Sequence, residues 1–246
     1  MSDLKILFED DHLIAIDKPS GLLVHPSWIA PRKTPNAVAL LKEYLGSTVY
    51  TIHRLDRATS GVLVFGKQKE AAQAMNAAFA ERRVQKTYLC VTRGYTPEQG
   101  VIDYPLKPIH DKKVDPFADP DKPAKDAVSE FRRLGTVELP IPVGRYETAR
   151  YSLVEVKPKT GRKHQIRRHL KHIFHPLVGD TKHGDGKHNQ LFRDHFGLER
   201  LLLMATELAF VHPVSGEQLD IRCNVDGYTD SLFRELGWTG LYPQAV

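Results

Sequence analysis

The sequence is organised around residues 49–61, which read Val-Tyr-Thr-Ile-His-Arg-Leu-Asp-Arg-Ala-Thr-Ser-Gly and precede the apolar residues 62–65. Two segments with strand-like composition therefore flank a charged turn. Because side chains alternate in an extended segment, Arg54 and Asp56 are expected on one face. A carboxylate among apolar neighbours is costly to keep ionised unless a cation or several donors face it. On these residues alone, Asp56 is either a surface carboxylate paired with Arg54 or Arg57, or part of a functional site.

Composition indicates a globular protein with a modest excess of positive charge. The chain has 246 residues, of which 41% are hydrophobic and 26% charged, and 35 Lys and Arg oppose 30 Asp and Glu. A net charge of +5 suits a polyanionic partner without proving one. Cys90 and Cys223 lie in apolar contexts without metal-ligand spacing, so we expect packed, reduced thiols. Residues 1–11 are acidic where a secretory signal is basic, and no apolar run approaches ~20 residues, which predicts a cytoplasmic protein.

Periodicity and turn residues predict alternating helices and strands along the chain. We expect strands at residues 4–8, 13–16, 86–91 and 151–156, a helix at 35–45 with Thr34 as N-cap and Pro35 at its first position, and helices at 69–83 and 162–173, the latter capped by Thr160. Residues 110–126 are rich in Pro, Asp and Lys, which predicts a surface loop.

Positive charge is concentrated in and just before the helix predicted at 162–173. Between residues 145 and 172, nine Lys and Arg oppose two Glu. Clustered cations release counterions from phosphates together, so this excess indicates RNA binding more strongly than the overall charge does. The histidines at positions 164, 169, 172 and 175 lack paired zinc-ligand spacing and a neighbouring Cys, so they indicate RNA contact or packing instead of a metal site.

The string His-Arg-Leu-Asp-x-x-Thr-Ser-Gly at 53–61 resembles the signature of the RluA-type pseudouridine synthases, which modify RNA. Lys-Pro-Ser-Gly-Leu at 18–22, Lys-x-Tyr at 86–88, Thr-Gly-Arg-x-His-Gln-Ile-Arg-x-His-Leu at 160–170, and the segments 176–180 and 201–213 resemble further blocks of that family. Two positions depart from it. His183 stands where the family often has Tyr, and Met204 stands where it often has His, so we assign Met204 no polar role.

The resemblance implies an α+β fold, with a mixed and largely antiparallel sheet, surrounding helices and a central basic cleft. Residues 1–246 are expected to form a single catalytic domain without an N-terminal S4 domain. By likeness, Asp56 is the catalytic carboxylate, Tyr88 stacks on the target base and assists proton removal, and Arg167 faces the aspartate. Arg54 is expected to fill the space that a flipped base leaves. The nucleic-acid-binding residues are expected to be Arg54, Arg162, Lys163, Gln165 and Arg168.

The implied reaction is isomerisation of uridine to pseudouridine in tRNA, at uridine 65 of the T-stem by likeness to one tRNA-acting member. A base inside a helix must be extruded first, at a cost of a few kcal/mol. The reaction is expected to need no cofactor and no metal. The expected partner is tRNA, with no membrane and no obligate protein partner. Two alternatives remain: a synthase acting on ribosomal RNA, and a non-enzymatic RNA-binding chaperone that uses the same basic surface.

Overall fold

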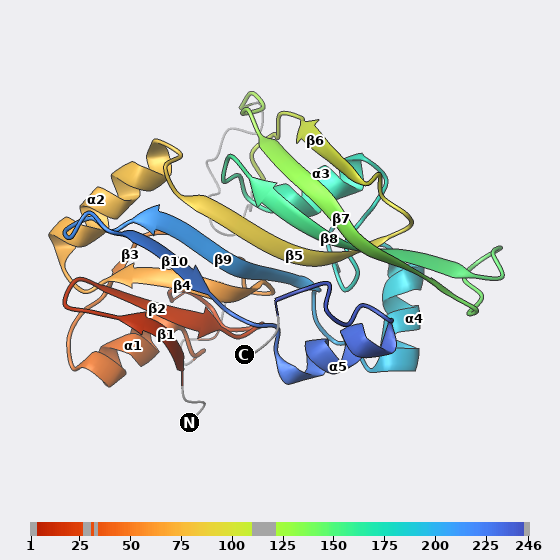
Figure 1. Cartoon of the computed structure of the whole chain (residues 1–246), viewed down its shortest axis with the longest axis horizontal. Helices are drawn as coiled ribbons and strands as arrows, with labels where there is room; N and C mark the ends of the chain where they lie inside the picture. The colour runs from red at the N-terminus through yellow and green to blue at the C-terminus, as the bar shows by residue number, and fades with distance from the viewer. Residues whose placement is uncertain (1–3, 27–30, 32–33, 110–121, 244–246) are drawn as a thin grey trace. The chain divides into compact units, whose positions relative to one another are not determined.

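The computed structural model describes residues 4–26, 31, 34–109 and 122–243 (Figure 1). The chain forms two compact units, each built from three segments of sequence. The first unit comprises residues 1–86, 106–125 and 207–223, and the second comprises residues 87–105, 126–206 and 224–246. Most of the loop predicted at 110–126 lies outside the described residues. No helix in the described part of the chain combines the length and the apolar character needed to cross a membrane.

The first unit contains a sheet in which every residue of the central strand, Ser60–Gly66, is buried. Its strands are β1 (Lys5–Glu9), β2 (Leu13–Lys18), β3 (Tyr50–Thr51), β4 (Ser60–Gly66), β10 (Gln218–Arg222) and the end of β9 (Leu203–Val211). The order is β1-β2-β4-β9, with β3 paired to β4 and β10 paired to β9. The pairings β1–β2, β2–β4, β3–β4 and β9–β10 are antiparallel. The strands predicted at 4–8 and 13–16 are confirmed.

Two helices belong to the first unit, α1 (Ala37–Leu45) and α2 (Lys69–Ala80). The prediction of Thr34 as the N-cap of α1 is wrong, because the side chain of Asn36 accepts the Ala39 N–H at 3.0 Å and begins the helix. The predicted end of α1 is confirmed at Gly46, which has φ +66°. Helix α2 lies against β3 and β4 and buries Met75 and three alanines in the core of this unit (Figure 1).

The second unit contains the longest strands. They are β5 (Gln85–Arg93) from residue 87 onward, β6 (Gln99–Asp103), β7 (Val128–Leu139), β8 (Ala149–Pro158) and the start of β9. The order is β9-β5-β8-β7-β6, and the pairings β5–β8, β7–β8 and β6–β7 are antiparallel. The strands predicted at 86–91 and 151–156 are confirmed, and so is the α+β class with a mixed, largely antiparallel sheet.

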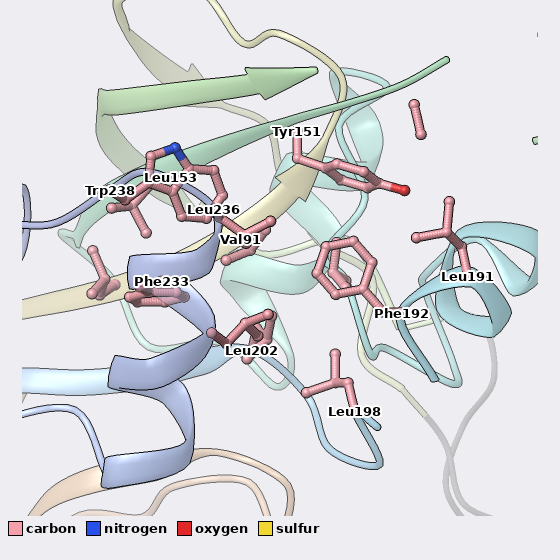
Figure 2. Close-up of a cluster of buried hydrophobic side chains, with 14 of the residues drawn as sticks. Val91, Tyr151, Leu153, Leu191, Phe192, Leu198, Leu202, Phe233, Leu236 and Trp238 are labelled. Atoms are coloured by element: carbon pink, nitrogen blue, oxygen red, sulfur yellow. The ribbon is translucent and has the colours of Figure 1, made fainter. Parts of the chain in front are cut away.

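Three helices complete the second unit: α3 (Gln165–His172), α4 (Gly186–Phe196) and α5 (Gly227–Glu235). Tyr151 of β8, Phe192 of α4, Phe233 of α5 and Trp238 pack in its hydrophobic core (Figure 2). Met204 is buried in the same core, as expected for a residue without a polar role. Cys223 is buried in the first unit and Cys90 in the second, and within the described residues neither takes part in a disulfide, as expected.

Candidate active site

The segment that carries Asp56 is not a strand. Only Tyr50 and Thr51 pair with β4, and residues 52–59 lie outside any strand. The predicted alternation of Arg54 and Asp56 on one strand face is therefore wrong. After Thr51 the chain leaves β4 and is held by two buried side chains, Ile52 and Leu55, while Arg54 is exposed and Asp56 is half-buried.

A tight turn begins at Asp56, where the Thr59 N–H donates to the Asp56 carbonyl at 3.0 Å. Two hydrogen bonds join this turn to Gly21. The Gly21 N–H donates to the Arg57 carbonyl at 2.8 Å, and the Arg57 Nε donates to the Gly21 carbonyl at 2.9 Å. Gly21 has φ +90°, a conformation that favours glycine. The Lys-Pro-Ser-Gly-Leu block thus fixes the backbone next to the candidate catalytic carboxylate.

Lys18, the first residue of that block, is fully buried. Its Nζ donates to the carbonyls of Pro19 at 2.9 Å, Leu22 at 2.9 Å and Arg57 at 3.2 Å. A buried ammonium is costly unless its donors are satisfied, and here three carbonyl oxygens accept from it. Lys18 therefore links the 18–22 block to the Asp56 turn. The sequence analysis identified the block but not this role.

His53 anchors the other end of the Asp56 segment. Its Nε2 accepts the Val64 N–H of β4 at 3.1 Å, and its ring stacks on Phe79 of α2 with centroids 4.8 Å apart. Burial, and then the charge of Lys86, lower the His53 pKa to about 3. A neutral ring with a free lone pair on Nε2 is the form that this backbone hydrogen bond requires. Near neutral pH, His53 thus remains a fixed acceptor.

In the second unit, Gln165 joins the loop before α3 to the start of β7. Its Oε1 accepts from the Thr160 hydroxyl at 2.7 Å and the Arg162 N–H at 2.9 Å. Its Nε2 donates to the Val128 carbonyl at 2.9 Å and the Ser129 Oγ at 3.0 Å. The prediction of Thr160 as N-cap is wrong, because His164 takes that position with φ +55° and no side-chain cap. Gln165 is buried with both donors and both acceptors engaged, which favours a structural role over direct RNA contact.

Arg167 is buried and forms a bidentate ion pair with Asp180. Its Nε lies 2.7 Å from Asp180 Oδ2, and its Nη2 lies 2.7 Å from Oδ1. Asp180 Oδ1 also accepts the N–H groups of Lys182 and His183, each at 2.9 Å. Burial raises the pKa of the Asp180 carboxyl, but these hydrogen bonds outweigh it and hold the pKa below its usual value. Asp180 therefore fixes one edge of the Arg167 guanidinium, a role that the sequence analysis missed.

The loop that carries Asp180 is itself held closely. Asn189 of α4 donates from Nδ2 to the Asp180 carbonyl at 2.9 Å and accepts the Gly179 N–H at 2.8 Å. Gly179 has φ +79°, and a Cβ there would lie 2.0 Å from the Arg200 carbonyl oxygen. A side chain at that position would displace the loop, so this packing requires glycine at position 179.

The other predicted site residues are divided between the two units. Tyr88 of β5 is half-buried opposite Val156, Arg162 donates from Nε to the Asp126 carbonyl at 3.0 Å, Lys163 is exposed, and Arg168 is half-buried. These residues and Arg167 belong to the second unit, whereas Arg54 and Asp56 belong to the first. The pairing of Asp56 with Arg167, the basic cleft and the single catalytic domain remain predictions.

The histidines near α3 make hydrogen bonds within the second unit. His164 Nδ1 lies 2.9 Å from His183 Nε2, His169 contacts Ser129 Oγ and the Tyr104 carbonyl, and His175 contacts the Arg93 carbonyl. Within the residues that the structure describes, no group of three His, Cys, Asp or Glu side chains is placed to hold a metal ion.

Residues 12–172 match the model of the family described as RNA pseudouridylate synthase. The chain belongs to this family. A Vibrio cholerae protein named tRNA pseudouridine synthase C is 48% identical over 235 residues, which cover 96% of each chain. A Pectobacterium carotovorum protein of the same name is 46% identical over 98% of this chain, but the chain spans only 64% of that relative. The solved structure of human RNA pseudouridylate synthase domain containing 1 superposes with a TM-score of 0.71, at 22% identity, over 98% of this chain and 97% of the human chain.

Membership of the family makes this pseudouridine synthase an isomerase and confirms the resemblance on which the sequence analysis relied. The human structure supports the fold alone, because its sequence identity is low. The non-enzymatic chaperone is the weaker alternative, since the match to synthases covers nearly the whole chain.

Proposed function

We propose that this synthase converts uridine to pseudouridine in tRNA, at uridine 65 of the T-stem. The observation that carries the proposal is the near full-length similarity to relatives named tRNA pseudouridine synthase C. The geometry around Asp56 supports it, because Lys18, Gly21 and His53 fix the backbone on both sides of the carboxylate. A catalytic group held in this way loses little entropy when substrate binds.

In the proposed reaction the Asp56 carboxylate breaks the bond between ribose C1′ and uracil N1. It does so either by attacking C1′ or by abstracting a ribose proton. The released base turns and forms a bond from C5 to C1′, which releases Asp56 as the carboxylate or is accompanied by return of the abstracted proton to the ribose. C5 then loses its proton and N1 gains one, so bonds and protons balance. Atoms and oxidation states are conserved, so the reaction needs no cofactor. The target base must first leave the helix, and in our proposal the side chain of Arg54, which is exposed, occupies the vacated space.

The second unit supplies the remaining groups. Tyr88 offers an aromatic face for the flipped base, where stacking contributes roughly 1–3 kcal/mol. Asp180 binds the Nε edge of Arg167, and in our proposal the rest of the guanidinium faces Asp56 and keeps it ionised. Arg162, Lys163 and Arg168 bind RNA phosphates, whereas Gln165 positions Arg162 through its backbone N–H. We place the protein in the cytoplasm with tRNA as its partner and no obligate protein partner.

The substitution Asp56→Asn tests the proposal, because it keeps the shape of the side chain and removes its charge. We expect at least a 1000-fold loss of pseudouridine formation, the order of effect seen when a catalytic group is removed. Asp194→Asn is the matched control, since Asp194 is an exposed residue of α4 that bonds only to Gln190 among the described contacts. The readout is nucleotide-resolved mapping of pseudouridine in tRNA treated with pure protein.

Full activity of Asp56→Asn would refute the role of the carboxylate. Conversion of ribosomal RNA but not of tRNA would refute the substrate and favour the alternative synthase. Conversion of tRNA at a position other than 65 would refute the site while leaving the reaction intact.

A further inference from the structure

Two of the described helices end with a left-handed residue that is not glycine. Helices α1, α4 and α5 are followed by a glycine in the left-handed conformation, at Gly46, Gly197 and Gly237. Helices α2 and α3 are followed instead by Arg82 with φ +60° and Phe174 with φ +67°. A side chain in that conformation is strained by contact between its Cβ and the backbone, which is why glycine is favoured there.

The turn after α3 is closed by the hydrogen bonds expected when glycine ends a helix. The Phe174 N–H donates to the Lys171 carbonyl at 3.0 Å, and the His175 N–H donates to the Leu170 carbonyl at 2.8 Å. This pair of bonds is the Schellman motif, and neither bond uses a side chain. The local geometry therefore requires a left-handed residue but gives no reason for a phenyl ring.

The ring of Phe174 is also poorly explained by packing. Its exposed fraction is 79%, the largest among the large hydrophobic residues that the structure describes. Phe174 is also the one hydrophobic residue among the described non-glycine residues with positive φ. An exposed apolar side chain is common by itself, but here it coincides with a strained backbone that glycine would relieve. Exposure and strain together point to a binding role.

Aromatic and cationic side chains lie close to Phe174 in the chain. Two residues earlier, the ring of His172 stacks on Tyr104 with centroids 3.6 Å apart and planes 17° apart, and Tyr104 is 43% exposed. Lys171 is exposed on the same last turn of α3. Arg93 Nη2 donates to the Phe174 carbonyl at 3.2 Å, and its Nη1 pairs with Asp185 at 2.6 Å. The Phe174 backbone is thus held in place while its ring faces solvent.

We propose that Phe174 is a stacking residue for an unpaired base of the RNA, outside the residues assigned to the reaction. The base lies on the phenyl ring, and Lys171 and Arg168 bind the adjoining phosphates. Aromatic faces accept any base, and neighbouring cations suit the attached backbone. A protein partner would need a wider apolar surface, whereas Phe174 is flanked in the chain by Lys171, His172 and His175. The proposal rests on the proposed function only in taking RNA as the substrate, and does not depend on which uridine is modified.

We expect the substitution Phe174→Gly to raise thermal stability and to lower the affinity for RNA. Relief of the left-handed strain should raise the midpoint of thermal unfolding, whereas loss of the ring should raise the Kd for RNA by about 5- to 100-fold, the range for one base stacked on an aromatic ring. Phe174→Trp keeps a stacking face and should bind RNA within about threefold of the unchanged protein. Arg82→Gly makes the same backbone change after α2 and calibrates the gain in stability.

The Kd is measured by fluorescence anisotropy with a tRNA transcript and with a ribosomal RNA fragment, in parallel with turnover. If the protein modifies ribosomal RNA instead of tRNA, the proposed function fails but the stacking proposal is still tested on the RNA that binds. An unchanged Kd for Phe174→Gly would overturn the proposal, and so would an equal loss of affinity in Phe174→Trp. Destabilisation by Phe174→Gly would also overturn it, because the ring would then be holding the fold.

Discussion

The buried pair of Arg167 and Asp180 gives the sharpest prediction for stability. In Asp180→Asn one carboxylate oxygen becomes an amide group whose N–H donors face the donors of the guanidinium. The native carboxylate accepts two bonds from Arg167 and two from backbone N–H groups, and the two side chains are 7% and 0% exposed. Breaking a buried ion pair from one side costs about 3–5 kcal/mol. For a chain of this size, that corresponds to a fall of roughly 10 °C in Tm.

Asp226→Asn is the matched control for this experiment. Asp226 also pairs with an arginine, Arg200, and accepts the Thr229 N–H at 3.0 Å, but its side chain is 43% exposed. Asparagine caps a helix about as well as aspartate, so only an exposed ion pair is lost and we expect a change below about 1 kcal/mol. The assay is urea unfolding at pH 7, followed by circular dichroism. Equal unfolding midpoints for the two variants would refute the reasoning about burial.

The same pair predicts a pH dependence. The folded-state pKa of Asp180 lies below its usual value of 3.8, so its contribution to stability is complete above that value and disappears as pH falls through the folded pKa. Asp180→Asn should therefore lose most stability near pH 7 and progressively less in acid. If the free energy of unfolding of Asp180→Asn fell as steeply in acid as that of the unchanged protein, the low pKa of Asp180 would be contradicted.

Two further predictions concern the Asp56 segment. The pKa of His53 is about 3 in the folded protein and near 6.5 in the unfolded chain. Between these values only the unfolded chain takes up the proton, so the free energy of unfolding should fall by up to about 1.4 kcal/mol per pH unit as pH falls from 6.5 to 3. His53→Gln should flatten that slope in urea titrations, and an unaltered slope would contradict the burial of the ring. Lys18→Met removes three hydrogen bonds to carbonyls and should cost about 2–4 kcal/mol. Lys5→Met, at a side chain that is 61% exposed, should cost almost nothing, and calorimetry that ranks the two equally would reject the role of Lys18.

The sequence predicted helices α1, α2 and α3 and strands β1, β2, β4, β5 and β8, because their apolar spacing is local information. It did not predict α4, α5, β6, β7, β9 or β10. The exact start of α1 depended on contacts that spacing does not contain. Thr34 and Asn36 are both good capping residues, but the Ala37 and Val38 N–H groups bind the carbonyls of Leu23 and Val24 and set where the helix begins. At α3, Thr160 was a reasonable cap that the fold uses elsewhere, as a partner of Gln165.

The site residues that lie in the family motifs could be predicted from the sequence. The contacts that hold them could not, because they join residues far apart in the sequence. The composition of residues 49–56 favoured a strand, but bonds from the Asp56 turn to Gly21 and from Val64 to His53 override that tendency. Asp180 lies 13 residues from its partner Arg167, across a turn that periodicity does not predict. The burial of Lys18 could not be predicted from the sequence, because it depends on three carbonyl groups that the fold brings around its ammonium group.

The division of both units into separate segments has a consequence for synthesis on the ribosome. Strand β4 ends at Gly66, but its neighbour β9 begins at Leu203, so the nascent chain exposes one buried edge of β4 until about 140 more residues have been translated. At typical elongation rates of ~5–20 residues per second, that interval is on the order of 10 s. An open strand edge of apolar residues is prone to wrong pairing during such a delay. Efficient production of this protein should therefore depend on chaperones that cover the emerging N-terminal third of the chain.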